Sequence, residues 1–177
     1  PSFTVFCPAD LHELCSALPE IIDRKQPCYF RYIAKQPFKN ENSKNMLQPE
    51  YYHSGEDIAI VSYGFMTEIA FKTAKVLSDN GYSTAAIHIP QIKPLHDQII
   101  LDLLQPFKKI IVVEDHFSIG GLYSALCELL ISNQCFKDIK SISFYNRWHQ
   151  SGLLDTVLEY EGFTPDQLFI KIKNLVD

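Results

Sequence analysis

The segment IIVVEDHFSIGGL at residues 110–122 constrains the fold more than any other part of the sequence. Its apolar part ends in three titratable residues, and a glycine pair follows: Glu114, Asp115 and His116, then Gly120 and Gly121. A short β-branched run that ends in polar residues and glycines is typical of a buried strand that leads through a tight loop into a helix. The segment therefore predicts a strand, a loop and a helix in succession.

Two earlier segments repeat this order of elements. DIAIVSY at 57–63 is an apolar run followed by apolar residues at helical spacing up to residue 77. YSTAAIHI at 82–89 is a second run, followed by a short helical pattern at 96–104. Successive strand-helix units join parallel strands, and their helices cover the faces of the sheet. The predicted fold class is therefore α/β, a three-layer αβα arrangement around a mostly parallel sheet.

The C-terminal part of the chain predicts the end of this sheet and two helices. A strand is expected at 142–144, and helical patterns follow at 153–162 and 165–176. The last pattern starts after Thr164, has proline at its first position and carries Gln167 three residues after the cap. These residue types at these positions mark the beginning of a helix.

Residues 3–34 predict a β-α-β unit in which Asp10 caps the helix. A sheet of two strands with no neighbour on either side is not stable alone, so we do not expect this unit to be an independent domain. Residues 35–56 are polar and contain two prolines. We interpret them as an exposed linker, with room for a short strand at its end, that leads into a second domain at 57–177.

Charge and composition exclude several classes of protein. The formal net charge is −5 and the basic residues are scattered, so nucleic acid is not an expected partner. No apolar run approaches the roughly 18 to 20 residues that span a bilayer, so no membrane association is expected. The five cysteines are odd in number and lack C-x-x-C spacing, and we interpret them as buried free thiols of a cytoplasmic protein.

Three motifs resemble one enzyme family. DIAIVSYG, IHIPQIKPLHDQII and IIVVEDHFSIGGLYSALCELL are similar, in order and spacing, to the C-terminal domain of transketolase-type thiamine diphosphate enzymes. That family has D-(apolar)-TG, (apolar)-P-(S/T)-IKPLD and VEEH-(x)2-GGLGSA at these places. The resemblance covers residues 57–177 and extends weakly through 1–36, where PAD-x-x-E implies the incomplete end, 1–34, of the pyrimidine-binding domain. Four residues depart from the family pattern: Tyr63, His96, Asp115 and Tyr123.

The resemblance implies an enzyme that transfers a two-carbon ketol unit between sugar phosphates. Such an enzyme uses thiamine diphosphate and a divalent metal, Mg, and is built as a homodimer. The GDG...N segment that holds the metal and the glutamate that activates the cofactor are both missing from this chain. We therefore expect a piece that binds no cofactor, contains no catalytic residue or metal site, and serves dimerisation and structural support beside a missing N-terminal section. The alternative is a free-standing, non-catalytic module that binds a partner or a ligand.

Two cations are candidates for contact with a substrate phosphate, and the assignment comes from the resemblance. The family carries an arginine on the strand that closes the middle domain, and aligning YFRYIAKQ with that strand places Lys35 at its position. Arg31 takes that position if the register follows pyruvate dehydrogenase beta subunits. Lysine keeps the charge and loses the bidentate geometry of arginine.

The central motif allows a catalytic and a structural interpretation. Glu114, Asp115 and His116 end a strand where open α/β sheets place their sites, which suits acid-base chemistry or a metal. Three consecutive strand residues cannot all face one way, so we favour a role in orienting the adjacent loops. Gly120 and Gly121 lack the spacing and the following lysine of a phosphate loop, so we favour close helix-strand packing for both.

A second cluster, Arg147, Trp148 and His149, combines a large aromatic side chain with cations. Such clusters are frequent at protein interfaces. A surface loop packed by one tryptophan explains the same residues, and both interpretations stay open.

Overall fold

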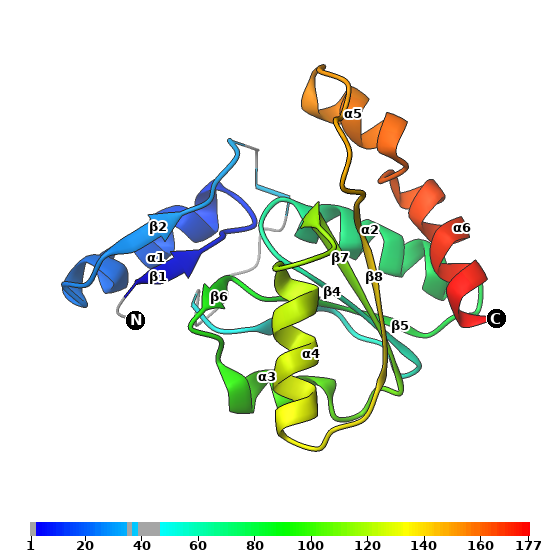
Figure 1. The fold of residues 1–177 in the computed structure, drawn as a ribbon, viewed down its shortest axis with the longest axis horizontal. Coiled ribbons are helices and arrows are strands. Elements are labelled where there is room, and N and C mark those ends of the chain that lie inside the picture. Colours follow the sequence, from blue (N-terminus) through cyan, green and yellow to red (C-terminus); the bar gives the residue numbers. More distant parts are fainter. Residues whose placement is uncertain (1–2, 35–36, 39–46) are drawn as a thin grey trace.

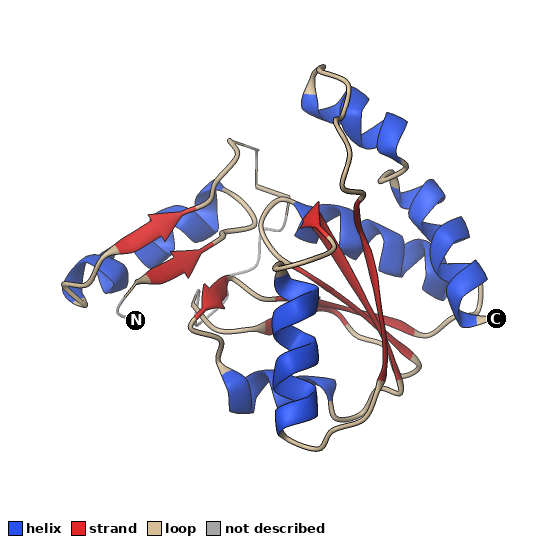
Figure 2. Ribbon diagram, viewed as in Figure 1, coloured by secondary structure: helices blue, strands red, loops and turns tan. Residues whose placement is uncertain are grey.

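A five-stranded sheet in the order β3-β5-β4-β7-β8 forms the centre of the molecule (Figures 1 and 2). Its strands are β3 (Glu50–His53), β5 (Thr84–His88), β4 (Ile58–Ser62), β7 (Lys109–Phe117) and β8 (Asp138–Phe144). The computed structural model describes residues 3–34, 37–38 and 47–177. β3 pairs antiparallel with β5, and the other neighbours pair in parallel. The predicted mostly parallel sheet is confirmed.

Helices cover both faces of this sheet. α2 (Met66–Asp79) and α6 (Pro165–Val176) pack on one face, and α3 (Asp97–Leu104) and α4 (Leu122–Ser132) pack on the other. The strands supply both layers because successive residues point to opposite faces. In β4, Ala59 and Val61 face α3 and α4, while Ile58 and Ile60 face α2 and α6. This is why the strands read as continuous apolar runs, and it confirms the predicted three-layer arrangement.

The C-terminal segment adds α5 (Leu154–Glu161) and α6. Two lysines of the sheet donate hydrogen bonds to carbonyl groups at the C-terminus of α6. Thr164 and Gln167 form the predicted capping box at the start of α6. At its other end, Lys140 donates to the carbonyl of Leu175 at 2.7 Å, and Lys109 donates to that of Val176. Cations at a helix C-terminus bind unpaired carbonyls and interact favourably with the helix dipole.

β8 is longer than the sequence suggested, since it begins at Asp138 rather than at residue 142. Its first half, DIKS, is exposed or half-buried and contains two charged residues. An edge strand can carry such residues, because its ladder hydrogen bonds, rather than an apolar run, define it.

The N-terminal unit, residues 3–34, contains β1 (Thr4–Phe6), α1 (Leu11–Asp23) and β2 (Cys28–Phe30), with β1 and β2 parallel. Asp10 caps α1 by accepting from the backbone N–H of Glu13 at 3.0 Å, as expected. The expectation of two strands without neighbours is wrong, because β6 (Gln91–Lys93) pairs antiparallel with β1. β6 lies between Pro90 and Pro94, and a residue that precedes proline is restricted to extended conformations.

The segment interpreted as a linker contributes to the sheet at its end. β3 lies within 35–56 and pairs with β5 at the edge of the sheet. The position of the domain boundary itself stays a prediction.

Candidate functional site

The candidate site is the region at the carboxyl ends of β4, β5 and β7, because open α/β sheets bind their ligands at this end of their strands. In this chain, the N-terminal unit occupies part of that end of the sheet. The N–H of Gly64, just after β4, donates to the carbonyl of Cys7 at 3.1 Å, and the N–H of Cys7 donates to the carbonyl of Pro90, just after β5, at 2.7 Å. The loop after β1 is therefore tied by its backbone to the ends of two strands of the other domain.

A buried polar chain runs from the N-terminal unit into the sheet. The Nε2 atom of His88 lies 3.1 and 3.0 Å from the two carboxylate oxygens of Glu13, and its Nδ1 atom lies 2.7 Å from the hydroxyl of Thr67. The Glu13 carboxylate also accepts from the N–H of Ala9. His88 and Thr67 are at most 1% exposed and Glu13 is 3% exposed, so this hydrogen-bonded group joins the N-terminal unit to the sheet and is closed to solvent.

Glu114 connects β7 to the start of α4. Its carboxylate accepts from the N–H of Leu122 at 2.8 Å and from the N–H of Tyr123 at 3.2 Å. Burial raises the pKa of Glu114, and the two N–H donors act against that rise. The expected role in orienting a loop fits this geometry. Glu114 therefore takes the N–H groups of Leu122 and Tyr123, which are not available to a phosphate.

Glycine is required at positions 120 and 121 for different structural reasons. A Cβ on Gly121 would lie 2.2 Å from Oε2 of Glu114, so close packing explains this glycine. The same explanation is wrong for Gly120, because a Cβ there meets nothing within 4 Å. Gly120 has φ of +81°, a backbone conformation that residues with a side chain rarely adopt.

Asp115 points away from Glu114 and pairs with Arg31, which follows β2. Its carboxylate oxygens accept from Nη1 and Nη2 of Arg31, both at 2.7 Å. The guanidinium also lies 5.6 Å from the centre of the Tyr63 ring. The hydrogen bonds that Arg31 donates to Asp115 raise the pKa of Arg31, so Arg31 stays charged. The structure therefore pairs Arg31, a candidate for contact with a substrate phosphate, with Asp115, which the sequence suggested as a residue that orients loops.

His116 is partly exposed at the end of β7, and its Nδ1 atom lies 2.8 Å from the carbonyl oxygen of Phe117. Across 3–34, 37–38 and 47–177, no group of three or more His, Cys, Asp or Glu side chains gathers as a metal site. Lys35, the other phosphate candidate, lies outside the described residues. That Lys35 or Arg31 contacts a substrate phosphate stays a prediction.

A cavity of about 440 Å³ opens between the N-terminal unit and the C-terminal domain. Arg31 and Tyr29 line it from the first, and Tyr63, His116 and Gly121 line it from the second. Lys93 of β6 completes the wall. This junction cavity is lined by three side chains of basic residues, Arg31, Lys93 and His116.

Arg147 and His149 both bind Glu161, the last residue of α5. Nη2 of Arg147 lies 2.6 Å from one carboxylate oxygen and Nδ1 of His149 lies 3.0 Å from the other. The hydrogen bond from His149 and the charge of Arg147 lower the pKa of Glu161. Trp148 between them is 98% exposed and packs no core. The interpretation of a loop packed by its tryptophan is therefore wrong, and the interface interpretation stays a prediction.

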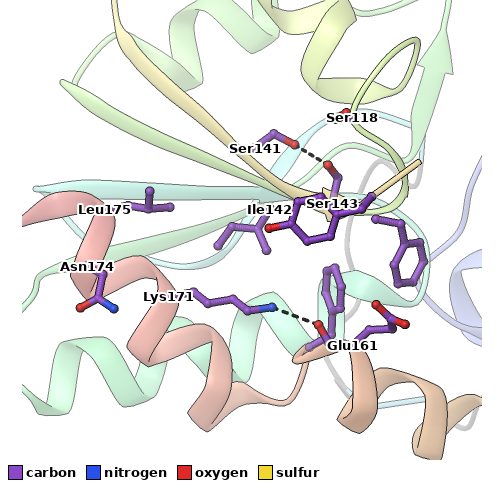
Figure 3. A pocket seen from close by; sticks show the side chains of 11 residues that line it. Ser118, Ser141, Ile142, Ser143, Glu161, Lys171, Asn174 and Leu175 are labelled. Carbon is purple, nitrogen blue, oxygen red and sulfur yellow. Dashed lines mark hydrogen bonds between the residues drawn. The ribbon is translucent and has the colours of Figure 1, made fainter. Parts of the chain in front are cut away.

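A second cavity, of about 420 Å³, lies between β8 and α6 (Figure 3). Lys171 of α6 extends along it, and its Nζ donates to the carbonyl of Glu161 at 3.0 Å. Ser141 and Ser143 bond to each other at 3.0 Å. The lysine in this cavity therefore binds the carbonyl group of the last residue of α5, and the two serines bind each other.

The cysteines are free thiols, and their environments differ. Cys7 is buried, and burial raises the pKa of its thiol to about 12, which makes it unreactive. Cys15 is exposed and Cys28, Cys127 and Cys135 are half-buried, so the interpretation of all five as buried thiols holds only for Cys7. None of the helices in the described ranges is both long and apolar enough to cross a membrane.

Comparison with known proteins places the chain in a family. The family model described as "Transketolase, C-terminal domain" matches residues 48–168. The chain belongs to the transketolase C-terminal domain family. The resemblance seen in the three motifs is thus confirmed.

Relatives with this domain include whole enzymes and separate sections. A putative transketolase C-terminal section from Methanocaldococcus jannaschii is 27% identical over 97% of this chain and 55% of its own length. A 1-deoxy-D-xylulose-5-phosphate synthase from Alkaliphilus oremlandii is 27% identical over 98% of this chain and 28% of its own length. The chain thus spans about a quarter to just over half of these relatives.

Solved structures support the fold. A split gene transketolase, solved as an inactive beta4 tetramer, superposes with a TM-score of 0.85 at 22% identity, over 99% of this chain and 58% of that one. A transketolase from Campylobacter jejuni superposes with a TM-score of 0.70 at 20% identity, over 98% of this chain and 26% of that one. Because both superpositions cover almost the whole chain, they include the N-terminal unit as well as the five-stranded sheet.

The residues present do not fit thiamine diphosphate and its metal. The two carboxylates at the end of β7 are used by the N–H groups of α4 and by Arg31. No GDG segment occurs in the sequence.

Sequence reasoning missed Glu13 as a partner of His88. Glu13 lies four and eight residues before Ala17 and Ile21, which are the other buried residues of α1. A carboxylate on the apolar stripe of a helix signals a buried partner, because a buried charge needs one. The partner itself, 75 residues away, requires the fold.

Proposed function

We propose that this chain is the C-terminal section of a thiamine diphosphate-dependent enzyme that transfers a two-carbon ketol unit between sugar phosphates. The observation that carries the proposal is the match to the transketolase C-terminal domain together with an N-terminal unit seated on the carboxyl end of its sheet. Relatives of comparable coverage are named as a transketolase section and as a 6-deoxy-6-sulfo-D-fructose transketolase subunit, the latter from a Clostridium species. The section supports a cofactor site that other residues of the enzyme supply, and thiamine diphosphate and Mg²⁺ belong to that complete enzyme.

Within this proposal, the section has two kinds of partner. One is the N-terminal section of the enzyme, which holds the cofactor, and the other is a second copy in a homodimer. The outer edge of β2 supports both, since the sheet order ends at β2 and its Tyr29 is 52% exposed. Arg147, Trp148 and His149 are further interface candidates.

The sugar phosphate substrate contacts Lys35 or Arg31 in this proposal. Arg31 is held by Asp115 and lines the junction cavity, which suits a cation that receives an anion. The enzyme acts in the cytoplasm.

The direct test is turnover by the complete enzyme. The chain, combined with its cofactor-binding section, thiamine diphosphate and Mg²⁺, should transfer a ketol unit from a ketose phosphate to an aldose phosphate. The 177-residue chain alone should show neither turnover nor micromolar binding of thiamine diphosphate in a calorimeter. Micromolar cofactor binding by the chain alone, or a complete enzyme without cofactor-dependent transfer, would contradict the proposal.

Association provides an independent test. Light scattering at tens of micromolar should report at least a dimer, to which residues 1–34 contribute. A chain shortened to start at Glu50 should associate less strongly. Equal association of the two, or a monomeric full chain, would remove the N-terminal unit from the interface.

The alternative function is a free-standing, non-catalytic module that binds a partner or a ligand. The junction cavity is the observation that favours it. It predicts that the chain is monomeric and that the complete protein has no ketol transfer activity.

A further inference from the structure

β8 is an edge strand of the five-stranded sheet, and no strand pairs with its outer side in the described part of the chain. The N–H of Asp138, the first residue of β8, donates to the carbonyl of Lys108, which precedes β7, at 3.0 Å. Successive residues of a strand in a parallel ladder direct their N–H and C=O groups alternately to the two sides. Asp138 and Ile142 therefore direct these groups toward β7, and Ser141 and Ser143 direct theirs outward.

The outward backbone groups of β8 are open to a partner. Across residues 3–34, 37–38 and 47–177, no backbone or side-chain hydrogen bond reaches the N–H or C=O groups of Ser141 or Ser143. β8 contains no proline, and Lys140 in its middle donates to the carbonyl of Leu175 on α6 instead of covering the edge. An uncovered strand edge is a template for pairing with another extended segment.

The second cavity, of about 420 Å³, follows this edge (Figure 3). It is lined by residues 141–145 in succession and by α6. Successive side chains of a strand point to opposite faces, and Ser141 and Ile142 lie on opposite sides of the β8 ribbon. What such residues share is the edge of their strand, so the cavity is a groove along the outer edge of β8, bounded on one face by α6. We call it the edge groove.

α6 contributes a cation to the edge groove. Nζ of Lys171 donates to the carbonyl of Glu161 at 3.0 Å, which uses one of the three N–H donors of the ammonium group and leaves two. The carboxylate of Glu161 is bound by Arg147 and His149, so it does not pair with Lys171. The charge of Lys171 therefore favours an occupant that brings a carboxylate.

The groove also has apolar walls that a ligand can reach. Phe144 and Leu175 are half-buried, and Tyr145 is 76% exposed. An occupant that suits all of these features has backbone groups for the strand edge, a carboxylate for Lys171 and an apolar side chain for the walls. An extended peptide combines the three, and several peptide-binding domains add such a peptide as a further strand at a sheet edge.

We propose that the edge groove binds an extended acidic peptide segment of a partner protein, which pairs with the outer edge of β8. The peptide backbone bonds to Ser141 and Ser143, and a glutamate or aspartate side chain meets Lys171. An apolar side chain two residues away lies on the same face of the added strand and rests on Leu175 and Phe144. Backbone pairing supplies affinity, and the side-chain contacts supply selectivity.

A second copy of this chain suits the edge groove less well. Two copies that joined their β8 strands about a two-fold axis would bring a second α6, with a second Lys171, to the same face of the joint. That arrangement offers Lys171 another cation in place of a carboxylate. The charge in the groove thus favours a separate acidic segment.

Hydrogen exchange, followed by nuclear magnetic resonance on the 177-residue chain, tests where such a peptide binds. The probe is acetyl-Thr-Glu-Thr-Val-Thr-amide, in which the glutamate and the valine share a face. At millimolar probe, the N–H groups of Ser141 and Ser143 should exchange severalfold more slowly than in the free chain. Unchanged exchange at both groups would overturn the site. Protection that grows with protein concentration in the absence of the probe would assign the edge to a second copy and overturn the peptide proposal.

Backbone methylation of the probe separates strand pairing from side-chain contacts. Alternate residues of an added strand face β8 with their N–H groups, and the residues between them face solvent. Calorimetry should therefore show that N-methyl groups on one alternate set abolish binding, whereas the same number on the other set leave it nearly unchanged. Equal binding of the two methylated probes would contradict pairing with the edge.

Variants of α6 test the charge. Lys171→Met should weaken binding of the probe by about fivefold, the order expected for a partly exposed ion pair. A probe with glutamine in place of glutamate should bind wild type and Lys171→Met equally. Lys173→Met removes the same charge from an exposed position of the same helix and should leave binding unchanged.

Circular dichroism checks that both variants fold. Equal weakening by Lys171→Met and Lys173→Met would reduce the effect to net charge and overturn the assignment of the acidic side chain. Because binding is measured on the chain without turnover, the result is independent of whether the complete enzyme transfers ketol units.

Discussion

The C-terminal domain and the N-terminal unit are stabilised in different ways. The five-stranded sheet has a large buried apolar cluster on each face, to which all four of its packed helices contribute. The N-terminal unit has a small cluster, in which Phe6, Ala17 and Ile21 pack with Leu47 from the segment that follows the unit. Burial of apolar surface is the main driving force of folding, so the first region can be stable by itself and the second cannot.

Polar contacts make up for the small core of the N-terminal unit. Glu13 binds His88, Arg31 binds Asp115, and Arg24 binds Gln91, each pairing the unit with the C-terminal domain. Polar contacts depend on direction, whereas apolar burial depends on area. The N-terminal unit is therefore oriented by directional contacts in addition to its backbone bonds and the β1–β6 pairing, and the buried Glu13–His88 contact is expected to matter most among them.

The largest effect is expected for His88→Ala. It leaves the buried carboxylate of Glu13 without its side-chain partner, and breaking a buried pair costs about 3 kcal/mol or more in the free energy of unfolding. His12→Ala, on the exposed side of the same helix as Glu13, is the control and should change stability by less than about 0.5 kcal/mol. Urea unfolding measures both. Equal stability of the two variants would mean that the polar contact does not hold the unit.

Gly121→Val comes next and tests the C-terminal domain. The branched side chain would meet the Glu114 carboxylate, so we expect a loss of at least about 2 kcal/mol. Gly120→Ala should cost about 1 kcal/mol, because it creates left-handed strain without a clash. Thermal unfolding should rank Gly121→Val as the less stable. An unchanged melting temperature for that variant would exclude close packing as the reason for Gly121.

Thr164→Ala should have a smaller effect, of about 1 kcal/mol, because it removes one side-chain cap from α6. Thr164→Ser keeps the capping oxygen and should be close to wild type. Chemical denaturation of the two variants provides the measurement. A loss as large as that of His88→Ala would show that local capping matters as much as the contacts between the two regions.

Acidification should have the smallest effect on stability. It weakens the contacts of Glu161 with Arg147 and His149, which lie in the loop at 145–153. The pKa of Glu161 is lowered in the folded state from its usual value of 4.5, so its contribution to stability is present above pH 4.5 and is lost as the pH falls through the lowered value. Wild type should therefore lose slightly more stability than Glu161→Gln between about pH 5 and pH 3. Parallel pH profiles for the two proteins would contradict a lowered pKa.

The sequence was sufficient for the elements whose signals are local. The apolar runs of β4, β5 and β7 predicted buried parallel strands, and Thr164, Pro165 and Gln167 predicted the start of α6. β6 escaped prediction because its partner is β1, more than 80 residues earlier, and a three-residue strand has no period of its own.

The candidate site was less accessible from the sequence. The motif located Glu114, Asp115 and His116 at a strand end, and their separate tasks depend on what the fold brings near them. Asp115 receives Arg31 across 84 residues, which no spacing rule indicates. The two glycines were singled out together, and backbone dihedrals were needed to separate a positive φ at Gly120 from a close contact at Gly121.

A double-mutant cycle on Glu13 and His88 tests the central claim most directly, namely that a buried polar contact holds the N-terminal unit on the transketolase C-terminal domain. The free energy of unfolding is measured for wild type, Glu13→Ala, His88→Ala and the double variant. Since the two side chains lie 3.0 Å apart and are buried, we predict a coupling energy of about 2 kcal/mol, so that the double variant loses about 2 kcal/mol less than the sum of the two single losses. Single losses that add to within about 0.5 kcal/mol would contradict the claim.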